Sequence, residues 1–216
     1  MVLSMSLRIT EIFFSLQGES NTVGLPTVFV RLTGCPMRCT YCDTAYAFHG
    51  GSKKEIADIL GEVGKYKTKH VTVTGGEPLA QPECHDLMRQ LCDLGYKVSL
   101  ETGGALPINE VDERVYVVLD VKTPASGEEP NNRYENLQHI KSSDALKFVI
   151  CDHHDYQWSK QFVAERKLDQ KCEVLFSPSA DQLNPTELAD WIIEDQLPVR
   201  MQIQLHKLLW ANEAGR

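Results

Sequence analysis

The chain has 216 residues, of which 42 % are hydrophobic and 24 % are charged, and its net charge is -8. This length and composition are typical of a soluble globular protein, and we expect residues 1–216 to form a single domain with a tail from about residue 208. The acidic charge argues against nucleic acid as a partner, and no run of about 18 apolar residues, as a membrane span needs, occurs.

Seven β-branched or apolar runs predict strands at 27–34, 70–76, 96–102, 115–122, 145–151, 172–178 and 199–205. Helical patterns lie between most of them, at 53–63, 83–95, 155–166 and 185–196. Strands alternating with helices predict a parallel sheet, so the fold class is α/β, as a partial or small barrel or as an open doubly wound sheet. The polar segment 124–137 is rich in turn residues and predicts a mobile loop.

Chemically distinctive residues follow several of the predicted strands directly. A cysteine run follows the first strand, and the sequence TGGEP (74–78) begins where the second strand ends. Other pairs end later strands: Glu101 and Thr102, Asp120 and Lys122, and Ser177 and Pro178. Because ligands bind at the carboxyl ends of parallel strands in both candidate architectures, these residues predict a site on one rim of the sheet.

The cysteine run GCPMRCTYCDT holds Cys35, Cys39 and Cys42, spaced C-x3-C-x2-C. Three thiolates suit zinc or an iron–sulfur cluster. A structural zinc would need a fourth ligand, for which His49, Cys84 or His85 are candidates; a catalytic zinc or a redox dithiol are further alternatives. The seven cysteines of the chain form no disulfide scaffold, and the start of the chain lacks an export signal, so we expect a cytoplasmic protein.

The cysteine spacing, Tyr41 before the last cysteine, and GGEP at 75–78 resemble the radical S-adenosylmethionine (SAM) enzymes. The resemblance implies a 4Fe–4S cluster on Cys35, Cys39 and Cys42, whose fourth iron binds SAM and cleaves it reductively to a 5′-deoxyadenosyl radical. A protein ligand on that iron would block the SAM site. Two alternatives remain: another radical SAM enzyme such as a glycyl-radical activase, and a non-enzymatic zinc-binding module.

The stretches LQGE, TGGEP, ETGG, LDVKTP, LKFVI, SPSA and QLHK, spread over the chain, resemble the 7-carboxy-7-deazaguanine synthase family. The resemblance implies a partial (βα)6-like radical SAM barrel of reduced size. It implies conversion of 6-carboxy-5,6,7,8-tetrahydropterin to 7-carboxy-7-deazaguanine with loss of ammonia, in queuosine and related 7-deazapurine biosynthesis. It also implies Mg2+ as a further cofactor, an electron donor such as flavodoxin or ferredoxin, and a homodimer.

The same resemblance assigns individual residues. The substrate contacts are Leu16, Gln17, Gly18, Arg31 and Thr74. The SAM contacts are Tyr41, Cys42, Asp43, Gly76, Asp120, Val121, Lys122, Ser177, Pro178, Ser179 and Ala180, and the Mg2+ ligand is Thr44. Many relatives carry Ser-Pro-Lys where this chain has Asp-Val-Lys, and the tail after QLHK is longer than the family pattern, so no contact is assigned to it.

Structural roles are the alternatives at several of these positions. An arginine inside an apolar strand, such as Arg31, needs an anionic partner, which is either the substrate carboxylate or an internal Asp or Glu. Gln17 is otherwise part of a loop before the barrel, and Tyr41 is otherwise a packing residue. Thr44 is otherwise the cap of a short turn or helix. For His206 and Lys207, a surface role and a site role remain open.

Overall fold

The computed structural model describes residues 5–180, 182–211, 213 and 215, which fold around one curved sheet. The strand order is β3-β1-β2-β4-β5-β6-β7-β8-β9. The strands are β1 (Ser6–Leu16), β2 (Pro26–Leu32), β3 (Ser52–Glu55), β4 (His70–Gly75), β5 (Lys97–Thr102), β6 (Tyr116–Asp120), β7 (Ala145–Ile150), β8 (Glu173–Pro178) and β9 (Arg200–Met201).

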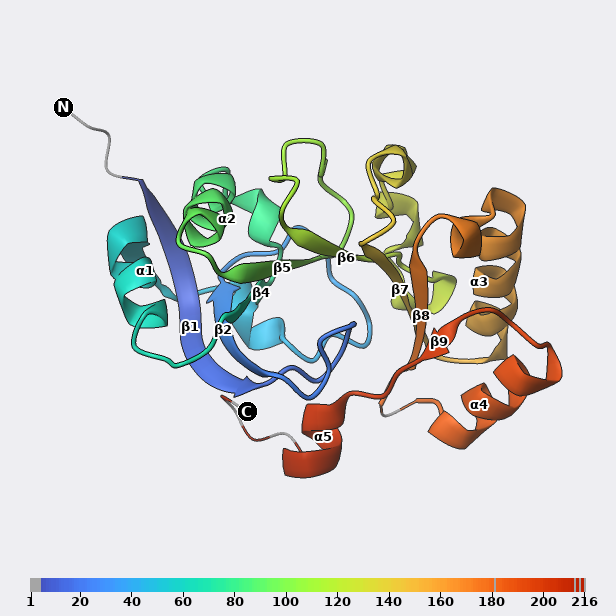
Figure 1. Cartoon of the computed structure of the whole chain (residues 1–216). Helices are drawn as coiled ribbons and strands as arrows, with labels where there is room; N and C mark the ends of the chain where they lie inside the picture. The colour runs from blue at the N-terminus through green and yellow to red at the C-terminus, as the bar shows by residue number, and fades with distance from the viewer. Residues whose placement is uncertain (1–4, 181, 212, 214, 216) are drawn as a thin grey trace.

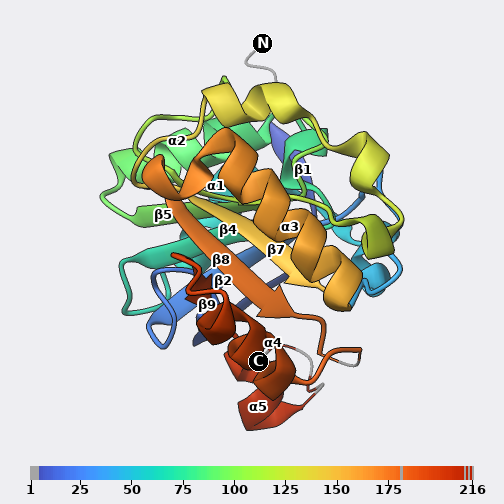
Figure 2. The same cartoon turned by 90° about the vertical axis from the view of Figure 1, so that its right-hand side faces the viewer.

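The sheet is parallel except at one edge. Strands β2 and β4 to β9 run parallel in chain order, whereas β1 is antiparallel to β2 and β3 is antiparallel to β1. Helices α1 (Ile56–Val63), α2 (Cys84–Asp93), α3 (His153–Arg166) and α4 (Pro185–Glu194) lie on the outer side of the arc (Figures 1 and 2). The α/β class and the partial (βα)6-like barrel are therefore confirmed.

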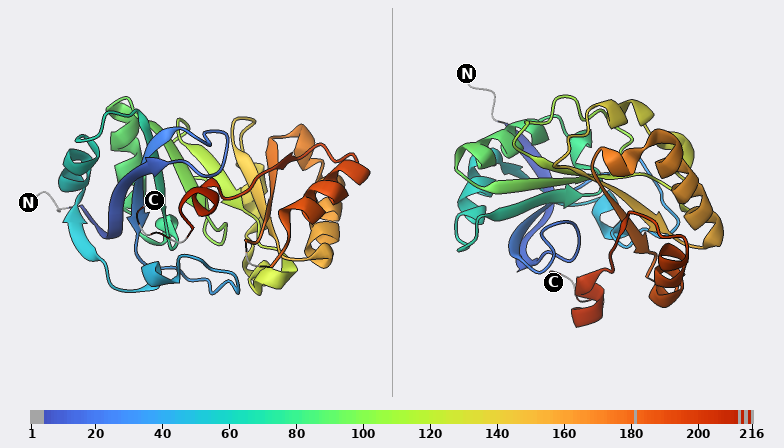
Figure 3. Two further views of the ribbon diagram at one scale, coloured as in Figure 1. Left: turned by 90° about the horizontal axis from the view of Figure 1, so that it is seen from below. Right: turned by 45° about the vertical axis from the view of Figure 1, so that its right-hand side comes forward.

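The core lies between the sheet and this outer helical layer. Side chains of β2 and β4, such as Val28, Val30 and Val73, are fully buried, as are Leu87 and Leu91 of α2. Burial on both faces explains why these strands read as continuous apolar runs. The concave inner side of the arc stays free of such helices, and seen from below it holds the cysteine loop and helix α5 (Leu205–Trp210) (Figure 3).

The amino-terminal edge differs from the sequence prediction. Strand β1 was not predicted, and it pairs with β2 along most of its length. The helix predicted from residue 53 begins at Ile56, because Ser52–Glu55 instead pair with the start of β1 as a short polar edge strand. A four-residue edge strand has no hydrophobic periodicity of its own, so its partner strand determines its conformation.

One later prediction also needs correction. The strand predicted at 199–205 shrinks to Arg200–Met201, and the chain turns into α5 at Leu205. The segment 124–137, predicted as a mobile loop, contains η3 (Pro124–Ser126), η4 (Glu129–Asn131) and most of η5 (Tyr134–Gln138), all short 3-10 helices, and its mobility stays a prediction. No helix among the described residues has the length and apolar character that crossing a membrane requires.

Candidate active site at the carboxyl ends of the strands

The carboxyl ends of the parallel strands enclose a cavity of about 410 Å³. Its lining includes the following residues predicted from the sequence: Cys35, Cys39, Tyr41, Cys42, Asp43, Thr44, Thr74, Gly76, Asp120, Lys122, Ser177, Pro178, Ser179 and Ala180. Val121 is absent from that lining, since its side chain is buried in the core and its backbone N–H donates to the Lys147 carbonyl. Segments far apart in the sequence thus meet at one rim, as expected.

The cysteine loop is held rigidly against its neighbours. The guanidinium of Arg38 donates to the carbonyls of Cys35 and Met37 and stacks over Phe48 at 4.3 Å. The backbone N–H of Arg38 donates to the Glu128 carboxylate at 2.6 Å. The loop therefore presents its thiols from a fixed backbone, which is what a multi-ligand metal site requires.

Two thiols of this loop differ from those of a reactive dithiol. All three cysteines are free and partly buried. Burial raises the pKa of Cys39 to about 11 and also raises the pKa of Cys35. Reactive dithiols have lowered pKa values, whereas a metal or cluster ligand gives up its proton on binding. The observation favours a metal-binding loop.

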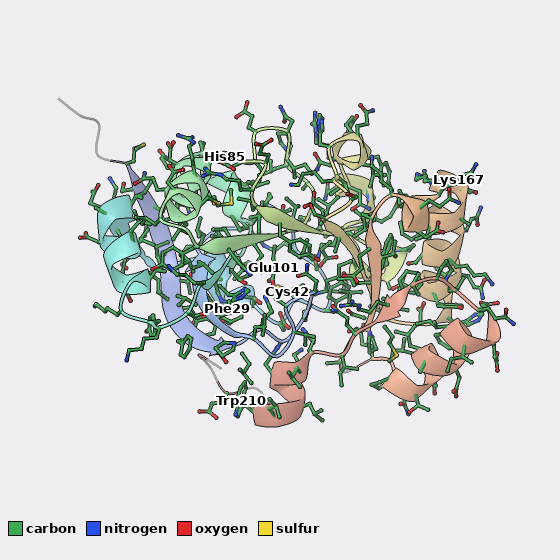
Figure 4. The ribbon with its side chains drawn as sticks, viewed as in Figure 1. Phe29, Cys42, His85, Glu101, Lys167 and Trp210 are labelled. Carbon is green, nitrogen blue, oxygen red and sulfur yellow. The ribbon has the colours of Figure 1, made fainter. Side chains whose placement is uncertain are left out.

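The three candidate fourth ligands for zinc are absent from the lining of the cavity at the cysteine loop. Cys84 is fully buried within the hydrophobic core at the start of α2. His85 also belongs to α2, on the outer side of the sheet, and is labelled there in Figure 4. His49 is exposed after the short helix η1 (Ala45–Phe48). The described residues contain no group of three or more His, Cys, Asp or Glu arranged around a single ion; the cysteines of a cubane bind three different irons and need not converge on one point.

The GGEP stretch packs directly on the cysteine loop. A Cβ atom on Gly76 would lie 2.2 Å from the carbonyl oxygen of Gly34 and 3.0 Å from the Cβ of Cys35. The backbone N–H of Glu77 donates to the same Gly34 carbonyl. Gly76, predicted to contact SAM, lines the first cavity, and its lack of a side chain also allows close approach of the cysteine loop. Any side chain here would displace the thiols.

The Glu77 side chain is fully buried beside the cysteine loop. Its carboxylate accepts hydrogen bonds from the Thr102 hydroxyl and from the backbone N–H groups of Leu79 and Gly103. Burial raises the pKa of Glu77, and these donors oppose that rise. The carboxylate therefore ties the ends of β4 and β5 together and acts as a structural clasp.

Three residues of the cavity lining carry buried polar atoms that have no partner among the described residues, and these test whether SAM fits. The hydroxyls of Tyr41 and Ser177 and the Oδ1 atom of Asp120 are buried and make no hydrogen bond. Buried polar atoms are normally paired, so three orphans around one cavity indicate a missing polar ligand. A ligand with hydroxyl, amino and carboxylate groups, such as SAM, satisfies donors and acceptors of both kinds. The polar residues of this cavity therefore fit SAM.

A second cavity of about 570 Å³ adjoins the first. It is lined by all five predicted substrate residues: Leu16, Gln17, Gly18, Arg31 and Thr74. Both cavities share the residues Glu19, Asp43, Thr44, Thr74, Gly75, Glu101, Lys147, Gln204 and Lys207. The site thus has a chamber at the cysteine loop and a chamber beside it, with a common wall.

Glu101 organises this common wall. Gln17 donates from Nε2 to its Oε1 at 3.3 Å, and the Thr74 hydroxyl donates to its Oε2 at 2.9 Å. Figure 4 shows Glu101 and Cys42 within the arc of the sheet, and both line the first cavity. Burial, followed by the nearby charge of Glu19, raises the pKa of Glu101. Glu101 thereby orients two of the predicted substrate contacts.

The sequence prediction placed Glu101 at the rim of the sheet but gave it no role, and it did not include Glu19 or Lys147. Lys147 of β7 is ion-paired with Glu19, and its pKa is raised because the nearby carboxylates outweigh the cost of burying the ammonium. A signal was available: Lys147 interrupts the apolar run ALKFVIC just as Arg31 interrupts VFVRL. A charged residue inside a buried strand needs a partner or a ligand.

Arg31 has an internal anionic partner. Its Nε lies 2.7 Å from Oε1 of Glu11, and the same oxygen accepts the hydroxyl of Tyr46 at 2.8 Å. The guanidinium also lies over the rings of Phe13 and Tyr46. The internal-acid alternative is therefore realised at Nε, and Arg31 still lines the second cavity.

Thr44 occupies the position before η1, but its side chain makes no capping hydrogen bond. Its hydroxyl instead donates to Oδ1 of Asp43 at 2.8 Å. The Thr44 hydroxyl oxygen donates its hydrogen in this bond, so its lone pairs remain suitable for a hard cation.

Helix α5 lies against this wall of the site. Its Leu205 N–H donates to the Gly18 carbonyl, and a Cβ atom on Gly18 would lie 2.6 Å from Nδ1 of His206. His206 and Lys207 both line the second cavity, so the site role is favoured over the surface role. Residues 212, 214 and 216 of the expected tail lie outside the described residues, while Ala211, Glu213 and Gly215 also line this cavity.

Known proteins resemble this chain in sequence and in structure. The model of the radical SAM superfamily matches residues 29–141. The chain is 43 % identical over 211 residues to the 7-carboxy-7-deazaguanine synthase of Chlorobaculum tepidum, covering 96 % of both. It is 42 % identical over 222 residues to that of Koribacter versatilis, covering 96 % of this chain and 98 % of the relative. The crystal structure of QueE from Escherichia coli shares the fold, with a TM-score of 0.77 over 94 % of this chain and 95 % of that chain, at 24 % identity.

Proposed function

The chain belongs to the 7-carboxy-7-deazaguanine synthase family of the radical SAM superfamily, and we propose that it converts 6-carboxy-5,6,7,8-tetrahydropterin to 7-carboxy-7-deazaguanine with loss of ammonia. This product belongs to the route to queuosine and related 7-deazapurines. The observation that carries the proposal is the pair of adjoining cavities, one at three cysteines and one with Arg31 and Glu101 in its wall.

The first chamber would hold the cluster and SAM, and the second would hold the substrate. Cys35, Cys39 and Cys42 would hold the 4Fe–4S cluster, and the unpaired atoms of Tyr41, Asp120 and Ser177 would bind SAM. When bound, the cluster and SAM supply the 5′-deoxyadenosyl radical. The protein supplies binding, orientation and exclusion of water, because a radical that meets solvent is lost to side reactions.

The second chamber offers groups that match a carboxylated pterin. Arg31 provides a guanidinium for the substrate carboxylate, with Glu11 fixing it from Nε. Gln17 and Thr74, oriented by Glu101, offer an amide and a hydroxyl to the edge of the ring. Lys147 holds a proton beside Glu19 at the wall shared with the first chamber. These contacts would place the substrate next to the adenosyl group.

Mg2+ and the partners are further parts of the proposal. We propose that Mg2+ binds the Thr44 hydroxyl together with the substrate carboxylate and waters, since this ion takes few protein ligands. A one-electron donor protein such as flavodoxin or ferredoxin would reach the cluster loop through its exposed residues Pro36, Arg38 and Thr40. A homodimer is expected from the family resemblance. The seven free cysteines suit a reducing cytoplasm.

Anaerobic reconstitution with iron and sulfide, followed by reduction with SAM present, tests the proposal. We expect 5′-deoxyadenosine, and with the pterin present we expect 7-carboxy-7-deazaguanine and ammonia in equal amounts by mass spectrometry and an ammonia assay. Bound zinc without SAM cleavage would support the zinc-binding module. SAM cleavage that is indifferent to the pterin, but transfers a radical to a protein, would support an activase.

A further inference from the structure

A buried ion pair lies at the cysteine loop, in the wall of the first cavity. The Nζ atom of Lys122 lies 2.8 Å from Oδ2 of Asp120, and their side chains are 8 % and 20 % exposed. The other oxygen of Asp120 is buried and has no partner in the described part of the chain. Charges so far from bulk water are weakly screened and act strongly on neighbouring charges.

The pair is fixed in place by its backbone. The side chain of Asn132 accepts from the Lys122 N–H at 2.9 Å and donates to the Lys122 carbonyl at 2.8 Å. Asp120 ends β6 within the sheet. The ammonium of Lys122 lies 5.7 Å from the ring centre of Tyr41, which stands between Cys39 and Cys42 in the loop. Lys122 also lines the same cavity as the three cysteines, so the positive charge is held on the cluster side of the loop.

Electrostatics at the thiols agree with this placement. Burial raises the pKa of Cys39 to about 11; the next influences are Lys122, which lowers it, and Asp120, which raises it. Lys122 also lowers the pKa of Cys35, behind burial, a backbone hydrogen bond and Glu77. The two members of the ion pair thus act on the same thiol with opposite sign.

We propose that Lys122 and Asp120 are positioning charges that set the reduction potential of the 4Fe–4S cluster. Reduction adds one electron, and so one negative charge, to the cluster. The ammonium of Lys122 stabilises the reduced cluster and raises its potential, while the carboxylate of Asp120 lowers the potential. The potential of such clusters responds to nearby charge and to burial. The proposal rests on the proposed function only in requiring the cluster on these cysteines.

The test is a redox titration of the reconstituted protein without SAM, followed by electron paramagnetic resonance of the reduced cluster. For Lys122→Met we expect the equilibrium constant for one-electron reduction to fall at least about tenfold, which is 59 mV toward negative potential. For Asp120→Asn we expect a shift toward positive potential. Lys122→Arg keeps the charge and should stay closer to wild type than Lys122→Met does.

Two further variants keep the test decisive. Lys122→Met leaves Asp120 buried without a counter-charge, so the double variant Asp120→Asn/Lys122→Met removes both charges in case the single variant fails to fold. The potential of the double variant should lie above that of Lys122→Met and below that of Asp120→Asn. Lys160→Met is the matched control, because Lys160 pairs with Asp195 and lines neither cavity.

Unchanged potentials in Lys122→Met and Asp120→Asn, or shifts of the same sign in both, would overturn the proposal. If Lys122→Met does not fold, the double variant is compared with Asp120→Asn, from which it differs only by the loss of the ammonium; a potential equal to or above that of Asp120→Asn would overturn the proposal. If the wild type forms the cluster and cleaves SAM, such a result removes this inference and leaves the proposed function intact. If the wild type binds no cluster, both fall together.

Discussion

The Nζ atom of Lys207 lies 3.2 Å from the carboxylate of Asp43, and this contact ties helix α5 to the cysteine loop. Gln204 donates to the same carboxylate at 3.1 Å. Asp43 follows Cys42 directly, and both Asp43 and Lys207 line both cavities. The position of α5 is thereby linked to the loop that presents the thiols.

Lys207→Met should loosen α5 without unfolding the domain. The two partners are 21 % and 42 % exposed, and such partly solvated pairs contribute about 0–1 kcal/mol, so amide hydrogen exchange in residues 205–210 should rise by up to about fivefold. Lys160→Met should leave exchange there unchanged. Equal exchange in wild type and Lys207→Met would mean that Gln204 and the backbone suffice to hold the helix.

The same contact has a defined pH dependence. Burial alone would raise the pKa of Asp43, but the charge of Lys207 and the hydrogen bonds from Thr44 and Gln204 outweigh it and hold the pKa well below its usual range. A lowered carboxyl pKa gives stability that is complete above the unfolded value of about 3.9 and is lost as the pH falls through the folded value. The docking of α5 should therefore be constant through the neutral range.

Replacing any one of Cys35, Cys39 and Cys42 by alanine should abolish the absorbance of the cluster and the cleavage of SAM, because each supplies one iron ligand. Cys84→Ala is the matched control: Cys84 lies in the hydrophobic core and should cost about 1 kcal/mol of stability while keeping cluster and turnover. Loss of the cluster in Cys84→Ala would contradict the three-ligand site.

The sequence predicted the site better than it predicted the edges of the fold. Residues at strand ends, such as Cys35, Thr74 and Ser177, could be placed together because parallel strands bring their carboxyl ends to one rim. The polar strand β3 depends on pairing with β1, and no local pattern encodes that pairing. Contacts between distant charges, such as Arg31 with Glu11, require the register of two strands and are likewise invisible in a single segment.

Arg31→Lys should leave the cluster intact and weaken binding of the pterin by about 1.5–3 kcal/mol, because lysine keeps the charge but loses the planar fork. The structure suggests a second variant, Glu11→Gln. It removes the carboxylate charge that holds Nε of Arg31, and it should weaken pterin binding less than Arg31→Lys does. Titration of the reconstituted protein measures both affinities. Unchanged affinity in Arg31→Lys would reduce Arg31 to the internal partner of Glu11.

Thr44→Val should erase any stimulation of turnover by Mg2+ while leaving the cluster spectrum and SAM binding unchanged. The substitution removes the only side-chain oxygen that this position offers, and Mg2+ would otherwise complete its shell with substrate and water. The measurement is product formation with and without Mg2+. Thr44→Ser, which keeps the hydroxyl, should retain the stimulation. Stimulation of equal size in Thr44→Val would place the ion elsewhere.

Glu101→Gln should stabilise the fold and weaken substrate binding. Burial and the neighbouring Glu19 raise the pKa of Glu101, so its ionised form is costly in the folded protein despite Lys147 and the Thr74 hydrogen bond. A raised carboxyl pKa makes the folded state bind more protons than the unfolded chain, so the free energy of unfolding falls as the pH rises through that raised value. The neutral amide removes this slope, and above the raised pKa it should increase the unfolding free energy by about 1 kcal/mol.

The same substitution weakens the anchor that orients Gln17 and Thr74, so the affinity for the pterin should fall several-fold. Urea unfolding under argon, from about pH 4, near the unfolded glutamate value, up to about pH 8.5, measures the difference from wild type. The exposed residue Glu113 provides the control, Glu113→Gln, which should change neither quantity. A Glu101→Gln variant that is less stable than wild type across the whole range would show that Lys147 needs this carboxylate as its counter-charge.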